Sequence, residues 1–426
     1  MGTVRLRQWW ADLLAAFWVR PAAMVAAAIA LAQLLVLAEG WVWLPDGLDD
    51  WFYAGGAAGA RDVLGVLAAA TIGVAGTTFS ITVAALTLAS NQMGPRLLRN
   101  FTRDPGNQYA LGALVATFAY SLVALRSVHD ADEGAFVPQL AVSVGLLMGF
   151  ACIGVLIWFL HHVASSISVD RVVALVQQDL RAALDHACRD TSAEPAQAPP
   201  GPQFDAPLTS PGSGYLRVLD DSALADWAAA HDAELHLETR PGDFVFPGSV
   251  IGSVTPAPLR EDARAQIAEA MVLGQVRSVE QDLEYAVRQL VEIALRALSP
   301  GINDPFTAIG VLDQLGAALT GLAGRRLPSG RIWRDGRLRL VRPATNYEGL
   351  ADAMFHMLRQ AGATQPAVMI RLLEVLAATA RVEQDLHRRA TLARHADLAR
   401  DAALRGTRDE AARNAILARR ALFPGG

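Results

Sequence analysis

The amino-acid sequence predicts an α-helical membrane protein with four transmembrane helices, followed by a cytoplasmic α+β domain. Hydrophobic residues make up 52% of the 426 residues and charged residues 19%, which is more apolar than most soluble proteins. Residues 22–160 hold few of the charges, and most arginines and acids follow them. Four uncharged stretches in the first part are each long enough to cross a bilayer. We therefore assign residues 1–165 to a membrane domain.

The four uncharged stretches cover residues 21–38, 63–95, 109–125 and 136–160. The first also fits a cleaved signal peptide that ends at Val36-Leu37-Ala38, but the spans that follow favour a retained helix. The second is longer than the roughly 20 residues that a bilayer requires. We expect this second helix to tilt or to extend beyond the membrane.

The charges of the loops predict an orientation. Arg96, Arg99 and Arg103 lie between the second and third spans, whereas the acids at positions 130, 132 and 133 lie between the third and fourth. Arginine is enriched in cytoplasmic loops. Both termini should therefore be cytoplasmic, in a multi-pass protein of the bacterial inner membrane. The three arginines form a basic interface, which either contacts anionic lipid headgroups or concentrates anions near a pathway.

The second span is rich in hydroxyl and amide side chains. At 100° per residue, these candidate lining residues divide between two faces: Thr71, Thr78 and Thr82 on one, and Ser80, Thr87 and Asn91 on roughly the opposite one. Small and hydroxyl residues allow membrane helices to pack closely, but they also line pathways for ions or small solutes, in a monomer or a homo-oligomer. The predicted span cores contain no ionisable residue, so a passive pathway fits better than a proton relay.

The soluble part begins with residues 166–213, which we expect to form an amphipathic helix and then a proline-rich linker. Residues 214–256 predict a small β module, with strands at 214–218 and 234–238 around a helix at 222–230. The turns and strands from Arg240 to Ile251 resemble the second half of a barrel-sandwich hybrid, the fold of biotinyl and lipoyl carriers. Because those carriers modify a lysine and this chain has none, we interpret the module as structural or as a docking surface.

Residues 257–426 predict a mainly helical cytoplasmic domain. Helices are expected over the ranges 281–298, 348–362, 366–388 and 392–422, with a small hairpin around residues 334–337. Ser299, Asn303 and Asp304 belong to a turn in which Asp304 is expected to cap the helix that begins at Pro305. The same turn is a candidate ligand or cation site, together with the earlier residues Glu280, Asp282 and Arg288.

Composition excludes several functional classes. The chain contains no lysine, which P-loops and pyridoxal enzymes require. A net charge of −5 argues against a nucleic-acid partner. Cys152 and Cys188 are the two cysteines, and we expect no disulfide. The sequence shows no catalytic Ser-His-Asp order and no Cys/His metal spacing, so we expect no enzyme activity, no metal and no cofactor.

Three stretches together carry a resemblance to a known group: residues 79–101, His161-His162-Val163, and residues 297–308 with the sequence ALSPGINDPFTA. In these three stretches, the chain resembles the bacterial predicted membrane proteins grouped as domain of unknown function 2254. The resemblance spans nearly the whole chain. It implies the architecture, and the family name implies no activity.

Two functional hypotheses remain open. The first is a channel-like passive pathway in a homo-oligomer, regulated by the cytoplasmic domain. The second is a membrane-anchored sensory or scaffolding protein without transport activity, whose cytoplasmic domain binds a protein partner. Besides such a protein partner, we expect the chain to contact the lipid bilayer.

Overall fold

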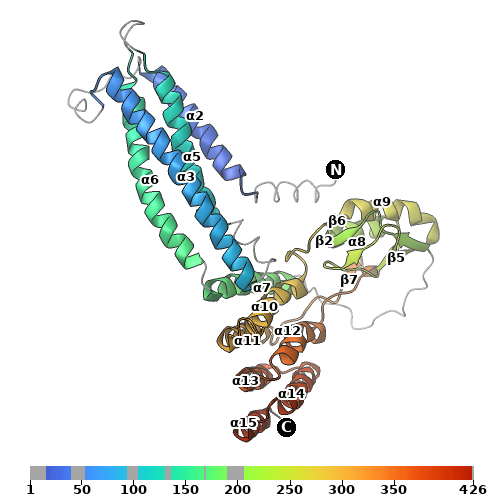
Figure 1. Cartoon of the computed structure of the whole chain (residues 1–426). Coiled ribbons are helices and arrows are strands. Elements are labelled where there is room, and N and C mark those ends of the chain that lie inside the picture. Colours follow the sequence, from blue (N-terminus) through green and yellow to red (C-terminus); the bar gives the residue numbers. More distant parts are fainter. Residues whose placement is uncertain are drawn as a thin grey trace. The chain divides into compact units, whose positions relative to one another are not determined.

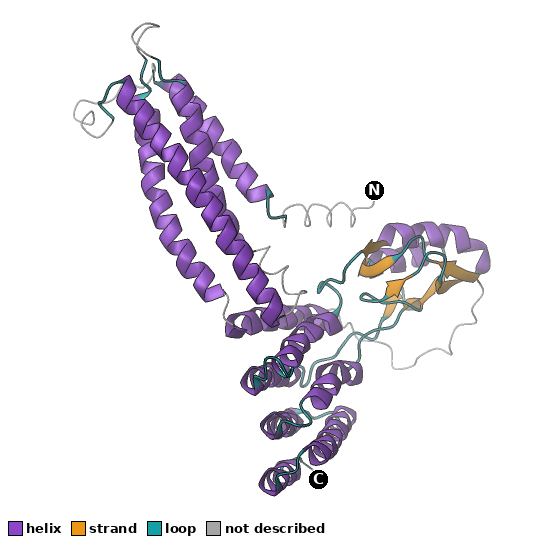
Figure 2. Cartoon of the chain, viewed as in Figure 1, coloured by secondary structure: helices purple, strands orange, loops and turns teal. Residues whose placement is uncertain are grey.

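The computed structural model of the chain describes residues 16–39, 53–93, 104–129, 136–166, 169–189 and 206–424. The chain divides into two compact units, an N-terminal unit of residues 9–168 and a C-terminal unit formed mainly by residues 169–426 (Figure 1). The described strands all lie in the C-terminal unit, as the colouring of Figure 2 shows. The basic interface of Arg96, Arg99 and Arg103 lies outside the described residues.

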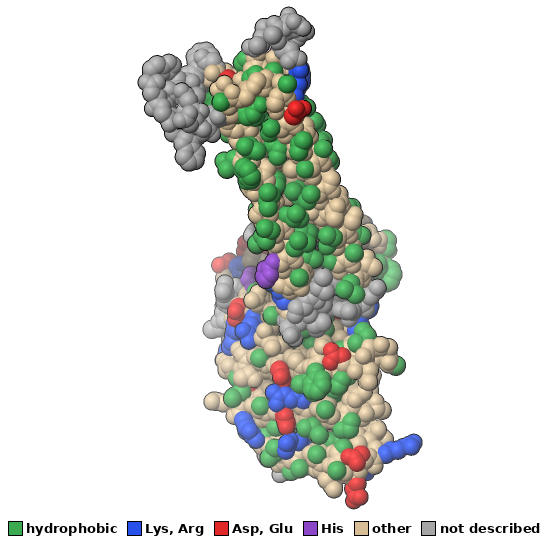
Figure 3. All heavy atoms as spheres, turned by 60° about the vertical axis from the view of Figure 1, so that its left-hand side comes forward, with side chains coloured by type: hydrophobic (Ala, Val, Ile, Leu, Met, Phe, Trp, Pro, Cys, Tyr) green, Lys and Arg blue, Asp and Glu red, His purple; other side chains and the backbone are tan. Residues whose placement is uncertain are grey.

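Long apolar helices build the described part of the N-terminal unit: α2 (Val19–Ala38), α3 (Ala57–Met93), α5 (Pro105–Arg126) and α6 (Gln139–Ser166). All four are long and apolar enough to cross a membrane, and they coincide with the four predicted spans. Helix α5 packs against each of the other three. Their outer surface carries many hydrophobic and few charged side chains, whereas arginines and acids are frequent on the C-terminal unit (Figure 3).

Small side chains allow these helices to approach one another closely. The core of the unit combines alanines, such as Ala32 and Ala116, with a few large residues, among them the fully buried Tyr120. The Tyr120 hydroxyl donates a 2.7 Å hydrogen bond to the carbonyl of Ala141. A Cβ added to Gly145 would stand 3.3 Å from both Leu64 and Tyr120, so a larger residue there would press on the core.

Asp104 caps the start of α5 as predicted, with Pro105 at its first position. Its Oδ1 accepts a 2.9 Å hydrogen bond from the Gly106 amide, and its Oδ2 lies 2.6 Å from Nε2 of His162 in α6. The His162 ring also stacks on Trp158. These contacts tie the start of α5 to the last turns of α6.

In the C-terminal unit, helix α7 (Val169–Arg189) precedes eight described strands: β1 (Ala206–Thr209), β2 (Gly214–Leu219), β3 (Glu234–Leu237), β4 (Phe244–Val245), β5 (Val250–Thr255), β6 (Met271–Gly274), β7 (Arg331–Arg334) and β8 (Arg337–Val341). One sheet has the order β1-β5-β3-β8-β7, in which β3 and β8 are parallel, and the other has the antiparallel order β4-β2-β6. Helices α8 (Asp221–Ala230) and α9 (Arg260–Ala270) share a hydrophobic core with these strands.

The expected strands at 214–218 and 234–238 and the helix between them are confirmed. The sheets, however, extend beyond residues 214–256, because β1, β6 and the β7–β8 hairpin also contribute strands. Part of the predicted linker is thus the strand β1, which pairs with β5. The strands divide between two sheets that share a core with helices, and a barrel-sandwich fold is not confirmed. The hairpin turn holds Asp335 and Gly336 at positive φ, which the predicted tight turn requires.

The remaining described helices are α10 (Leu283–Ala297), α11 (Pro305–Thr320), α12 (Tyr347–Ala361), α13 (Pro366–Val382), α14 (Leu386–Gly406) and α15 (Glu410–Ala421). Helix α13 packs against α11, α14 and α15, and α10 packs against α7, α11 and α12. The prediction of one helix over residues 366–388 is wrong. Helix α13 ends at Val382, and Asp385 caps a new helix by accepting hydrogen bonds from the amides of His387 and Arg388.

Candidate functional site

One predicted face of helix α3 packs inside the N-terminal unit. Thr71, Thr78 and Thr82 are all at most 7% exposed. The hydroxyls of Thr71 and Thr82 donate to the carbonyls of Leu67 and Thr78, at 2.6 and 2.9 Å. The buried Thr78 hydroxyl has no hydrogen-bond partner among the described residues. This face is therefore covered by neighbouring helices of the same chain.

The opposite face of α3 is exposed. Ser80 and Thr87 lie on this surface, and their hydroxyls donate to carbonyls one turn earlier, at 3.0 and 2.9 Å. Gly73 and Gly76 lie on the same exposed surface, where an added Cβ would meet nothing within 4 Å. Asn91 belongs to α3, but its side chain lies outside the described residues. The candidate lining residues are thus divided between a packed face and an open one.

An apolar pocket of about 230 Å³ opens between α3, α5 and α6. Its lining is almost entirely hydrocarbon, with Thr71 and Cys152 as the exceptions. Cys152 Sγ lies 3.2 Å from the Thr117 hydroxyl of α5. Such a surface suits a hydrocarbon chain and offers few groups to an ion. The sequence analysis did not single out Thr117 or Ser121, which are both buried. Their hydroxyl groups in an otherwise apolar third span could have pointed to them.

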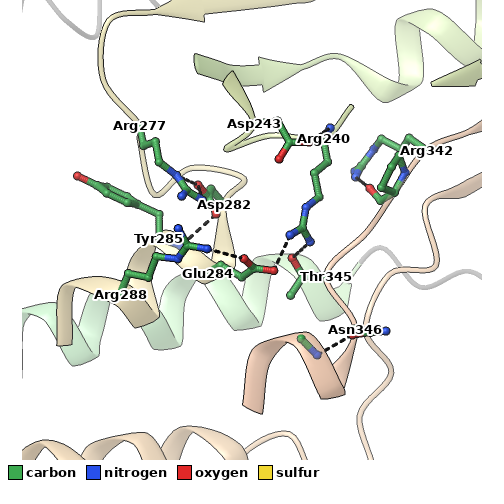
Figure 4. A network of polar contacts seen from close by, with 12 residues as sticks. Arg240, Asp243, Arg277, Asp282, Glu284, Tyr285, Arg288, Arg342, Thr345 and Asn346 are labelled. Atoms are coloured by element: carbon green, nitrogen blue, oxygen red, sulfur yellow. Dashed lines mark hydrogen bonds and ion pairs between the residues drawn. The ribbon is translucent and has the colours of Figure 1, made fainter. Parts of the chain in front are cut away.

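A second candidate region is a network of charges at the start of α10. The Glu284 carboxylate lies between two guanidinium groups, 2.6 Å from Arg240 and 3.3 Å from Arg288 (Figure 4). Arg240 also donates to Thr345 at 2.9 Å, and its amide donates to Asp243 at 3.0 Å. Residues distant in sequence are thereby joined at one buried carboxylate.

Asp282, beside this network, has two roles. It caps α10 by accepting a 3.0 Å hydrogen bond from the Tyr285 amide, and it forms an ion pair of 2.5 Å with Arg277. Burial raises the pKa of Asp282 above its usual range, although the charge of Arg277 and its hydrogen bond act in the opposite direction. The side chain is 4% exposed, so the ion pair is an interior contact of the unit.

A polar pocket of about 180 Å³ lies next to the network, lined by parts of α7, the segment at 280–283 and the loop at 328–331. Arg240 and Arg342 contribute to its wall, and Asp221 holds Arg342 through two short contacts of 2.8 and 2.5 Å. Because both arginines already have carboxylate partners, the pocket presents nearly balanced charges. It suits a small polar molecule better than a free phosphate.

The turn from Ser299 to Pro305 has the predicted capping geometry. Asp304 accepts hydrogen bonds from the amides of Phe306 and Thr307, at 3.1 and 3.2 Å, and from the Thr307 hydroxyl at 2.6 Å. These bonds, the hydroxyl bond first, lower the pKa of Asp304 below its ordinary value. Ser299 donates to the Arg296 carbonyl, and Asn303 adopts a positive φ of 52°.

The proposed joining of this turn to Glu280, Asp282 and Arg288 is wrong. Glu280 and Asp282 precede α10, and the turn follows its last residue. A helix of 15 residues is about 22 Å long. Asn303 instead accepts a 3.0 Å hydrogen bond from Gln365, just before α13. The turn therefore connects α10, α11 and α13.

Comparison with known proteins agrees with the long apolar helices of the N-terminal unit. A family model described as predicted membrane protein (DUF2254) matches residues 15–378. The chain belongs to this family. It is 36% identical, over 412 residues, to uncharacterized proteins of Mycobacterium tuberculosis (strain CDC 1551 / Oshkosh) and Mycobacterium bovis. These alignments cover 94% of the chain and 79% of each relative. No solved structure matches the chain.

Proposed function

We propose that this member of the DUF2254 family forms a passive pathway for ions or small solutes in the bacterial inner membrane. Several copies of the chain would place the exposed face of α3 around a shared axis. The C-terminal unit would lie in the cytoplasm, as the charges of the loops predict, and regulate opening.

The contrast between two exposed helix faces carries the proposal. Helix α6 exposes large apolar residues at helical spacing: Leu146, Leu147, Phe150, Ile153, Ile157 and Leu160. Such a face suits lipid. Helix α3 also exposes apolar residues, such as Phe79 and Val83, but Ser80, Thr87 and two glycines lie exposed among them. Contacts within the chain do not account for these glycines, because an added Cβ would meet nothing within 4 Å at either one.

Cysteine accessibility tests this arrangement. In a cysteine-free background, Ser80→Cys and Thr87→Cys should react with a charged, membrane-impermeant thiol reagent in reconstituted protein, because water reaches a pathway lining. Phe150→Cys and Ile157→Cys are matched controls, since both native side chains are more than 60% exposed on the apolar face of α6. The controls should stay unreactive. Protection of Ser80→Cys and Thr87→Cys would remove the main support for a pathway.

Ion flux separates the pathway from the scaffolding alternative. The hydroxyls of α3 are already bonded to carbonyls of their own helix, which also suits a packed interface. A scaffold would give no flux from proteoliposomes loaded with a potassium- or chloride-sensitive dye, together with protected cysteines. A pathway requires flux that the thiol reagent reduces in Ser80→Cys and leaves unchanged in Phe150→Cys.

A further inference from the structure

Two histidines and an aspartate from two helices meet in the C-terminal unit. Asp352 and His356 stand one turn apart on α12, and His395 projects from α14. Each offers a ligand atom within 4.8 Å of those of the other two. Both imidazole Nε2 atoms approach the same carboxylate oxygen, Asp352 Oδ1, at 3.0 Å from His395 and 3.1 Å from His356.

Three nitrogens crowd this one oxygen. Arg394 also donates to Oδ1, at 2.6 Å. A carboxylate oxygen has about two lone-pair sites, yet three nitrogens converge on Oδ1. A cation among the three side chains relieves this crowding, because Nε2 of each histidine then offers a lone pair in place of a proton.

The spacing and chemistry of the group suit a transition metal. With Zn–N and Zn–O distances of about 2.0–2.1 Å, the ligand atoms of a tetrahedral site stand about 3.3 Å apart. The two separations from Asp352 Oδ1, 3.0 and 3.1 Å, are close to this value, and all the ligand atoms lie within 4.8 Å of one another. An imidazole nitrogen and a carboxylate oxygen are both ligands that such a cation accepts.

We propose that Asp352, His356 and His395 bind one divalent transition-metal cation and thereby join α12 to α14. His395 is 1% exposed, whereas His356 is 37% and Asp352 35% exposed, so the site opens to solvent on one side. Two imidazoles and one carboxylate leave at least one coordination position for water.

The positive charge of Arg394 opposes cation binding at this site. Besides its contact with Asp352, its Nη2 lies 3.4 Å from the Glu348 carboxylate. When a cation binds Asp352, Arg394 keeps Glu348 as its partner. Removing the arginine charge should therefore strengthen metal binding, whereas removing a ligand should weaken it.

Zinc titration of the metal-stripped full chain in detergent tests the proposal. Wild type should bind one Zn²⁺ per chain at this site, and Co²⁺ in its place should give the visible absorption of a tetrahedral complex. His356→Gln and Asp352→Asn should each weaken Zn²⁺ binding by more than about tenfold, since even outer partners of a ligand account for 10–100-fold. Arg394→Gln should bind Zn²⁺ at least as tightly as wild type.

His387→Gln is the matched control, because His387 is exposed near the start of α14, two turns from His395. It should bind as wild type does. His356 is a partly exposed side chain, so its replacement tests the site even where a change at the buried His395 unfolds the unit. Absence of a bound Zn²⁺ in wild type, or equal affinity in wild type, His356→Gln and Asp352→Asn, would overturn the proposal.

Discussion

The cap at Asp304 yields the sharpest stability prediction. Replacing Asp304 by Ala removes the acceptor of two backbone amides and of the Thr307 hydroxyl. Loss of such a cap costs about 1–2 kcal/mol, which corresponds to a factor of roughly 5–30 in the closed-to-open ratio of the helix. Asp304→Asn keeps a capping oxygen and should cost less than about 0.5 kcal/mol, because Asn and Asp cap helices almost equally well.

Hydrogen exchange of the α11 amides in the full chain measures this effect. Protection around Leu312 and Leu315, which are fully buried, should fall in Asp304→Ala and change little in Asp304→Asn. Unchanged protection in Asp304→Ala would refute the capping argument. Equal damage in both variants would show that the charge itself is needed, as the ligand-site hypothesis for this turn requires.

The contribution of the Asp304 cap to stability decreases at acidic pH. Because the pKa of Asp304 is lower in the folded protein than in the unfolded chain, its contribution is fully present above the unfolded value of about 3.9. The contribution is lost as the pH falls through the folded pKa. Wild type and Asp304→Asn should therefore differ least in α11 protection at the acidic end of the titration.

Three further substitutions test other parts of the chain. Glu284→Gln should destabilise α10 by about 1–2 kcal/mol, because Arg240 loses the charge of its partner; unchanged exchange of the α10 amides would contradict an energetic role for the network. Gly149→Val should lower the thermal stability of the protein in detergent, since even its Cβ would collide with Leu67. Gly73→Val should leave that stability unchanged and weaken oligomers that form through α3, measured by crosslinking; an equal loss of stability in both glycine variants would contradict the exposed position of Gly73.

Much of the fold follows from local patterns in the sequence. The apolar runs predict the four long apolar helices, and Asp104-Pro105 and Asp304-Pro305 predict two helix starts; the structure confirms both. The break between Val382 and Asp385 was missed, because apolar residues continue the helical period up to it and the Asp385 cap resembles an ordinary surface charge. The parallel pairing of β3 with β8 was also missed, since about 100 residues separate the strands and no local pattern joins them.

The candidate sites, too, follow partly from local sequence patterns and partly from tertiary packing. The sequence by itself determined that α3 is polar and that its hydroxyls lie on two faces, because helical periodicity is a property of neighbouring residues. Only the tertiary structure decided that Thr71 is covered while Ser80 is open, since this depends on where α5 and α6 pack. Asp352 and His356 show a spacing of four residues, but His395 joins them from a separate helix. Contacts between distant helices are fixed by packing of their buried faces, and the order of residues along one helix does not encode them.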